Sequence, residues 1–203
     1  MLDANSIEFL PEEHIYLVDG VIVPSVTQIV RSEMEGMYDN VPSYILQRKA
    51  DYGNMVHQLI EEYEVKGLPS DNPLLGKYLD AKKDWYTSKF WADNAVYTTE
   101  NGALKGYKFV KSEEMVATDR FAGTYDLMGA DGTLFDIKTT YKFDHRYLEI
   151  QLGMYYYALG TERDIAWCIW MPKQKAYGQF LRIRPIGFRE VEDIVDRYYD
   201  GHL

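Results

Sequence analysis

The chain has little cysteine: Cys168 is the one cysteine among 203 residues. A single cysteine excludes an internal disulfide, and it excludes zinc and iron–sulfur sites that need four cysteines. Cys168 lies in the apolar run IAWCIWM, where we interpret it as a buried, inert thiol. Scarce cysteine is typical of reducing compartments, so we expect a cytoplasmic protein.

Long apolar runs and a secretion signal are also missing. No apolar run reaches about 18 residues, so no membrane span is expected. The first residues, MLDANSIEFLPEEH, are acidic and lack the basic start and apolar stretch of a signal peptide. Hydrophobic residues make up 46% and charged residues 27% of the chain, which is typical of a folded, soluble protein.

Basic residues are also fewer than acidic ones. The chain has 22 Lys and Arg against 32 Asp and Glu, for a net charge of -10. This balance argues against broad, sequence-independent adhesion to nucleic acid, although a local basic patch can still hold phosphate. The 18 tyrosines are many for this length. We interpret most of them as half-buried packing residues with wet hydroxyls, and stacking on bases or sugars is the alternative.

Turn signals and hydrophobic periodicity divide the chain into helices and strands, with no internal repeat. A hairpin is predicted over 6–23 with its turn at Asp19-Gly20, followed by a short helix capped by Ser25. Further helices are predicted at 43–66, 72–92, 144–160 and 188–200, and strands at 94–99, 107–118, 120–129, 133–138, 164–171 and 176–184. Lys82-Lys83 is interpreted as a solvated helix face, with phosphate contact as the alternative. The order predicts an α/β (mixed α+β) fold: a central mixed β-sheet flanked by helices.

The strand predicted at 133–138 carries two charges two residues apart. Side chains alternate along a strand, so in LFDIK Phe135 and Ile137 face one way, while Leu134, Asp136 and Lys138 face the other. Buried charges are costly unless they are paired or bind a metal. The alternative is an edge strand whose two charges are solvated as a weak surface pair. These five residues alone do not choose between the two interpretations.

Several other polar positions are ordinary when each is taken alone. His57 follows Gly53 in the predicted long helix, where a glycine costs about 1 kcal/mol and suggests a close approach to the backbone. Asp126 lies in GTYDLMG, and alternation allows only one of Glu113 and Glu114 to face inward. A helix surface or a strand end would explain each of these residues without a function.

Gln151 and Tyr155 are spaced i,i+4 on one face of the predicted helix at 144–160, together with Leu148, Leu152 and Leu159. Alone they are explained by a buried amide that bonds the backbone and a packing tyrosine.

In order, the pieces read GxxxH, E, GTxD, DIKT and QxxxY, from residue 53 to residue 155. This run resembles the RecB-like branch of the PD-(D/E)XK nuclease superfamily, which includes the nuclease domain of the RecB helicase-nuclease and phage recombination exonucleases. The segment HIYLVDGVIVPSVTQIV is also similar to the N-terminal part of phage-encoded members. The resemblance implies a restriction-endonuclease-like core in a single domain over 1–203, with an N-terminal hairpin and helical extension at about 1–40.

Three departures from the family pattern stand out. Tyr125 stands where the superfamily's name has a proline, as in many RecB-like members. The single cysteine rules out the four-cysteine iron–sulfur cluster of several relatives. The chain has no GxxxxGK[ST] sequence, so it carries no helicase motif of that kind.

The resemblance implies a metal-dependent DNA nuclease, with exonuclease action in recombination or repair favoured. Hard carboxylate oxygens suit Mg²⁺ or Mn²⁺. By resemblance, the metal ligands are His57, Asp126, Asp136, the backbone carbonyl of Ile137 and, directly or through water, Glu113, which is preferred to Glu114. Lys138 orients the attacking water, and Gln151 and Tyr155 line the groove. Candidate phosphate contacts are Arg48, Lys49, Lys142 and Arg146.

DNA is the expected partner, and the resemblance adds a single-strand annealing protein and a homo-oligomer as candidates. Three other functions remain open at this point: a non-catalytic nucleic-acid-binding module of the same fold, a restriction-type endonuclease, and a tyrosine-rich carbohydrate-binding protein. The motifs decide neither the polarity of cleavage nor single-strand against duplex preference.

Overall fold

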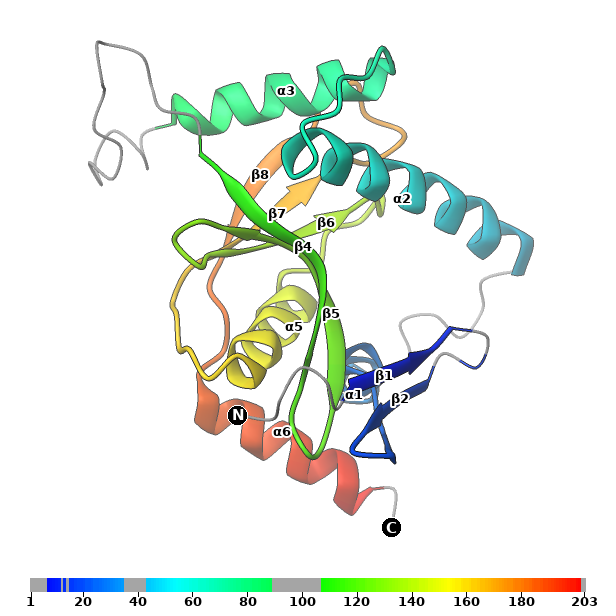
Figure 1. Cartoon of the computed structure of the whole chain (residues 1–203), viewed down its shortest axis with the longest axis vertical. Helices are drawn as coiled ribbons and strands as arrows, with labels where there is room; N and C mark the ends of the chain where they lie inside the picture. The colour runs from blue at the N-terminus through cyan, green and yellow to red at the C-terminus, as the bar shows by residue number, and fades with distance from the viewer. Residues whose placement is uncertain (1–6, 12, 14, 35–42, 89–106, 202–203) are drawn as a thin grey trace.

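The computed structural model describes residues 7–11, 13, 15–34, 43–88 and 107–201, and it leaves the side chains of 43–50 undescribed. Its helices and strands follow one another along the chain as drawn in Figure 1. They are β1 (Ile7–Leu10), β2 (Ile15–Val18), β3 (Val21–Val23), α1 (Val26–Glu33), α2 (Ser43–Glu64), α3 (Pro73–Tyr86), β4 (Phe109–Ala117), β5 (Ala122–Gly129), β6 (Leu134–Lys138), α5 (His145–Ala158), β7 (Ala166–Trp170), β8 (Gln179–Ile183) and α6 (Phe188–Asp200).

The N-terminal strands form a small antiparallel sheet in the order β1-β2-β3, as the hairpin pattern predicts. Asp19 and Gly20 both have positive φ angles, +52° and +78°, which a tight turn between twisted strands requires. Ser25 caps α1 in a capping box with Gln28. A parallel bridge from Ser25 to Ala122 ties this part to β5, and α1 contacts α5 and α6.

The central sheet has five strands in the order β4-β5-β6-β7-β8. Its pairs are antiparallel except for β6 and β7, which run parallel, so the sheet is mixed as predicted. The strand with the two charges, β6, lies between β5 and β7, and its Asp136 is only 2% exposed. The interpretation of β6 as an edge strand with solvated charges is therefore wrong.

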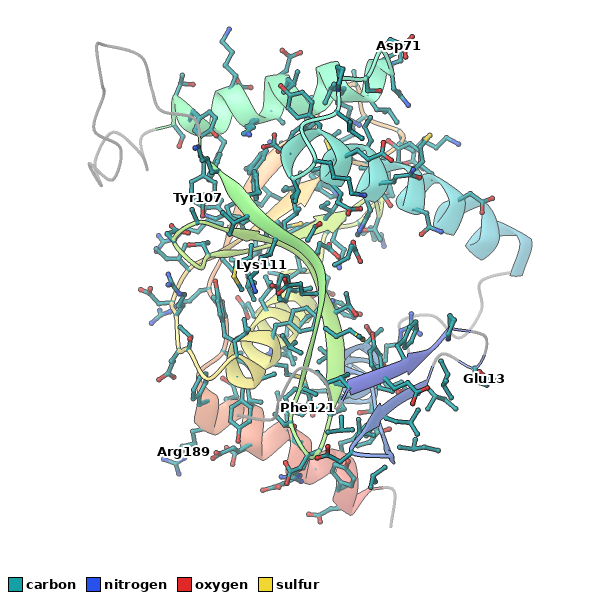
Figure 2. All side chains as sticks on the ribbon, in the orientation of Figure 1. Glu13, Asp71, Tyr107, Lys111, Phe121 and Arg189 are labelled. Carbon is teal, nitrogen blue, oxygen red and sulfur yellow. The ribbon has the colours of Figure 1, made fainter. Side chains whose placement is uncertain are left out.

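Helices cover both faces of this sheet, and Figure 1 shows α2 and α3 on one side and α1, α5 and α6 on the other. One hydrophobic cluster joins Leu134 to α1, α5 and α6, and a second joins Phe135 and Ile137 to α2 and α3. Figure 2 shows Tyr107 at the start of β4, where its backbone N–H donates to the hydroxyl of Tyr86 over 2.6 Å. The flanked mixed sheet is consistent with a restriction-endonuclease-like fold.

Two predictions need correction. The helix predicted over 72–92 ends at Tyr86 and is capped by Thr87, while the strand predicted at 94–99 lies outside the described residues. Lys82 is not on a solvated face, because its ammonium lies 2.6 Å from both carboxylate oxygens of Glu64 and is 12% exposed. None of the described helices has the length and apolar character needed to cross a bilayer.

Candidate active site

The polar residues singled out in the sequence meet where β6 ends, and five elements bring them there. His57 comes from α2, Glu113 from β4, Asp126 from β5, Asp136 and Lys138 from β6, and Gln151 from α5. The end of β6 lies close to α2, because the ring of His57 reaches the carbonyl oxygen of Ile137 at 3.0 Å (Figure 1).

One glycine permits close packing at the site. A Cβ on Gly123 would stand 2.8 Å from the ring of Tyr155, closer than real Cβ contacts, so the glycine of the GTxD pattern admits this tyrosine. A Cβ on Gly53 would stand 3.4 Å from the hydroxyl oxygen of Thr139, an ordinary van der Waals contact, so the approach of the segment after β6 to α2 does not require a glycine there.

His57, Glu113 and Asp126 form a cluster whose ligand atoms all lie within 4.8 Å of one another. Nδ1 of His57 is 3.5 Å from Oδ1 of Asp126 and 3.7 Å from Oε1 of Glu113. Because Nε2 lies 3.0 Å from a carbonyl, which can only accept, that nitrogen carries a proton and donates to Ile137. The nitrogen left to act as a metal ligand is therefore Nδ1, which faces the two carboxylates.

Glu113, rather than Glu114, reaches this cluster. Its φ is +50°, an uncommon value for a residue with a side chain, and cross-strand pairing jumps from Ser112 to Glu114 around it. Glu114 is instead engaged elsewhere, since its Oε2 accepts hydrogen bonds from the hydroxyl of Tyr125 and from the ammonium of Lys111, both at 2.8 Å. A backbone outlier at a polar cluster is the kind of strain found at functional sites.

Asp136 is buried and pairs with the half-buried Lys138 beside this cluster. The ammonium of Lys138 donates to Oδ1 of Asp136 over 2.7 Å, and Oδ2 lies equally close to it, so the carboxylate pairs with the ammonium through both oxygens. Oε1 of Gln151 has no hydrogen-bond partner within the described part of the chain. A buried polar oxygen without a partner is costly, so this atom indicates a place for a further ligand.

The charges of the site shift one another's pKa values. Burial raises the pKa of Asp136 to about 6, even though Lys138 opposes this shift. Burial lowers the pKa of Lys138, but the carboxylates of Asp136 and Asp126 outweigh it and raise that pKa above its ordinary value. For His57 the burial effect is likewise outweighed by Asp126 and Glu113, which raise the pKa to about 9. Lys138 is therefore a cation at neutral pH, suited to holding an anion or a water.

The buried face of α5 supplies Gln151 and Tyr155, which bond each other through Nε2 and the hydroxyl at 3.1 Å. Sequence reasoning missed a third residue on this face, Tyr147, whose ring lies 5.8 Å from the ammonium of Lys138. Its position four residues before Gln151 was the signal that could have revealed it.

The four predicted phosphate contacts lie in different surroundings. Arg48 and Lys49 belong to the part of α2 whose side chains are not described. Lys142 is exposed in the loop after β6. Arg146 pairs with Glu190 and Glu149 and lines a groove of about 880 Å³ that also contains Arg163. None of the clustered acids lines that groove, and phosphate contact by these four residues stays a prediction.

The donor set fits a hard divalent cation. It combines one imidazole nitrogen with carboxylate oxygens of Asp126 and Glu113, and the carboxylate of Asp136 lies beside them in its ion pair with Lys138. Oxygen-rich sites of this kind suit Mg²⁺ and Mn²⁺, and the histidine nitrogen favours Mn²⁺ slightly. The family resemblance implies that the Ile137 carbonyl is a further ligand, and its oxygen lies 3.0 Å from Nε2 of His57.

Comparisons with solved structures find distant similarities. The alkaline exonuclease LHK-Exo from Laribacter hongkongensis is 11% identical over 88% of this chain and 87% of that chain, with a TM-score of 0.43. A structure titled SSO0001 is also 11% identical, over 84% of this chain and 81% of that chain, with a TM-score of 0.32. A scan of protein-family models and a search of curated proteins both find no match. At this distance the similarities carry no argument, so the functional interpretation depends on the site itself.

Proposed function

We propose that this protein is a metal-dependent deoxyribonuclease that hydrolyses phosphodiester bonds. The observation that carries the proposal is the meeting of His57, Asp126 and Glu113 with the ion pair of the buried Asp136 and Lys138. Carboxylates that share a site with a protonated lysine match the needs of phosphodiester hydrolysis: cation binding, and stabilisation of the charge that develops on the phosphate.

Each residue has a role that its position permits. His57, Asp126, Asp136, Glu113 and the Ile137 carbonyl would hold Mg²⁺ or Mn²⁺. When bound, the cation supplies charge neutralisation for the phosphate and lowers the pKa of a water molecule.

The remaining polar groups act on the water and on the substrate. Lys138 stays protonated beside Asp136, so it orients the attacking water and offsets phosphate charge rather than removing a proton. The carbonyl oxygen of Gln151, which has no hydrogen-bond partner among the described residues, can accept from that water, and Tyr155 fixes the amide by accepting from its nitrogen. The buried tyrosine also excludes solvent, and burial raises its pKa well above the ordinary value, so it stays neutral.

Among nucleases, we favour an exonuclease that acts in recombination or repair. This choice comes from the motif order GxxxH, E, GTxD, DIKT and QxxxY, which resembles RecB-like and phage exonucleases. A single-strand annealing protein as partner, and assembly into a homo-oligomer, are proposals with the same origin.

A cleavage assay tests the proposal. End-labelled linear duplex, single-stranded DNA and closed circles are incubated with Mg²⁺, Mn²⁺ or EDTA, with wild type and with Asp136→Asn. Asp193→Asn, an exposed acid on α6, is the matched control. We expect metal-dependent loss of linear DNA, intact circles, an inactive Asp136→Asn and an active control.

Other outcomes revise the proposal in defined ways. Cut circles would keep the site and change the activity to an endonuclease. If a folded wild type cuts no substrate with either metal, the chain is a binding module of the same fold and the nuclease proposal is wrong.

A further inference from the structure

Two loops begin at the same end of the central sheet, where β6 and β7 finish. The two strands are parallel, Lys138 pairs with Trp170, and the backbone N–H of Met171 donates to the carbonyl of Lys138 over 2.7 Å. Residues 139–143 and 172–178 therefore leave the sheet side by side, directly after the lysine of the candidate active site. Ligands commonly bind outside the carboxyl ends of parallel strands.

These loops differ in charge from the rest of the molecule. Their sequences, TTYKF and PKQKAYG, contain three lysines, Lys142, Lys173 and Lys175, and no acid, in a chain whose net charge is -10. Lys142 and Lys173 are exposed. A local excess of positive charge beside an acidic site provides the phosphate contacts that the overall charge does not.

The same loops expose two aromatic rings. Tyr141 is 62% exposed and Tyr177 is 52% exposed, so these two differ from the half-buried packing residues that most tyrosines were interpreted to be. Exposed rings beside lysines form a platform on which unpaired bases stack, because every base has a π face. The bases of a duplex are already stacked inside the helix and cannot use such rings.

The two loops are held in place by hydrogen bonds to the rest of the protein. The indole N–H of Trp170 donates to the carbonyl of Thr140 over 2.8 Å. The ammonium of Lys77, from α3, donates to the carbonyls of Pro172 and Lys175 at 2.7 and 2.9 Å. A surface that is already ordered loses less conformational entropy when a ligand binds.

Trp170 at the end of β7 joins the two loops. Its indole donates to Thr140, its ring lies 5.9 Å from the ring of Phe143, and the ammonium of Lys175 lies 4.1 Å from its ring centroid. Within the second loop, that ammonium also lies 5.4 Å from the ring of Tyr177. Lys173 extends the surface to α2: its ammonium lies 5.5 Å from the ring of Tyr52, and both residues line a cavity of about 460 Å³ with Met55 and Asp51.

We propose that this basic-aromatic face, defined as Tyr141, Lys142, Lys173, Lys175 and Tyr177, binds unpaired DNA and leads the substrate strand to the active site. The inference rests on the proposed nuclease function and deepens it by naming single-stranded DNA as the substrate that the site receives. The lysines contact phosphates, and the two tyrosines stack on bases.

Binding is measured first, without cleavage. The fluorescence anisotropy of a labelled oligothymidine and of a labelled hairpin duplex is followed in EDTA, for wild type and for variants of the face. We expect the oligothymidine to bind more tightly than the duplex. Tyr141→Ala and Tyr177→Ala should each weaken oligothymidine binding about five- to a hundredfold, while Tyr141→Phe and Tyr177→Phe keep the ring and bind as wild type does.

The lysines are tested by salt dependence. Lys142→Ala and Lys173→Ala should each lower the slope of log K against log salt by about 0.7. Lys108→Ala is the matched control, since Lys108 is an exposed lysine before the edge strand β4. Equal binding of duplex and oligothymidine, or wild-type affinity in both alanine variants of the tyrosines, would overturn the proposal.

A second assay separates this inference from the nuclease proposal. Hydrolysis of thymidine 5′-p-nitrophenyl phosphate, which is too small to span the face, should be unchanged in Tyr177→Ala while degradation of single-stranded DNA falls. If both substrates are lost in a folded variant, the face belongs to the catalytic site and the binding role is wrong. If the wild type hydrolyses neither substrate, the nuclease proposal fails while the anisotropy result still decides the inference.

Discussion

The Lys82–Glu64 pair between α3 and α2 and the Lys138–Asp136 pair on β6 are both withdrawn from water, but their surroundings differ. Glu64 is fully engaged: both oxygens accept from Lys82 at 2.6 Å, and one also accepts from the hydroxyl of Tyr78. Asp136 also pairs with its lysine through both oxygens, but it lies near a second acid, Asp126, and burial together with that charge raises its pKa. The second pair therefore adjoins a cluster of candidate metal ligands.

This difference shows that a buried charge alone does not mark a functional site. A buried ion pair such as Lys82–Glu64, whose oxygens all accept hydrogen bonds, contributes to the stability of the fold through those hydrogen bonds. An ion pair beside further acids leaves excess negative charge, which a bound cation balances. Matched substitutions in the two pairs can therefore separate structure from function.

The largest expected effect is on activity. Lys138→Met should lower the rate of DNA cleavage on the order of a thousandfold or more, because the cation that offsets phosphate charge is gone. Lys82→Met should leave the rate per folded molecule unchanged, since Lys82 pairs with Glu64, and no hydrogen bond or ion pair among the described residues joins Lys82 to the candidate site. Single-turnover cleavage with correction for the folded fraction measures both, and a similar loss in the two variants would erase the distinction.

The loss of unfolding free energy should follow the reverse order, larger in Lys82→Met than in Lys138→Met. Lys82→Met leaves Glu64 buried with only the Tyr78 hydroxyl, and should cost about 3–5 kcal/mol of unfolding free energy. Lys138→Met should cost less, because Asp136, whose pKa is already about 6, becomes neutral when its partner is removed. Urea denaturation at neutral pH compares the two variants, and a larger loss in Lys138→Met would contradict the assignment of roles.

The pH dependence of stability should single out Asp136. Its folded-state pKa of about 6 lies above the ordinary value of 3.8, so between these values the folded protein holds a proton that the unfolded chain releases. Stability of the metal-free wild type should therefore fall as pH rises through this window, relative to Asp136→Asn, by on the order of 3 kcal/mol. Urea titrations of both proteins in EDTA measure the difference, and a pH-independent gap would refute the shift.

A smaller effect should distinguish the two neighbouring acids of β4. Glu113→Gln should lower metal affinity or activity about 10- to 100-fold, because Glu113 faces His57 and Asp126. Glu114→Gln should stay near wild type, since Glu114 is held by Tyr125 and Lys111 instead. Equal effects of the two substitutions on Mn²⁺ affinity, measured by calorimetry, would remove Glu113 from the metal site.

Local chemistry explains which parts of this fold could be predicted from the sequence. Asp19-Gly20 sets the hairpin turn, Ser25 starts α1, and Gly160, with φ +66°, follows the end of α5, all as expected from short-range rules. The helix predicted to residue 92 shows the limit, because an amphipathic pattern continues past Thr87 where the backbone already turns away.

Long-range pairing explains what could not be predicted. Lys82 looked like a surface lysine because nothing local reveals Glu64, which is 18 residues away in sequence. The contact of His57 with the Ile137 carbonyl spans 80 residues and depends on how α2 packs on the sheet. The motif order found the residues of the candidate site, but which oxygens lack partners becomes visible only in the folded chain.

Anomalous diffraction from crystals grown with Mn²⁺ would show whether the cluster at the end of β6 binds a divalent cation. We expect a strong anomalous peak within bonding distance of Asp126 and His57, absent in crystals of Asp126→Asn. A Mn²⁺-saturated protein with no peak among His57, Glu113, Asp126 and Asp136 would contradict this expectation.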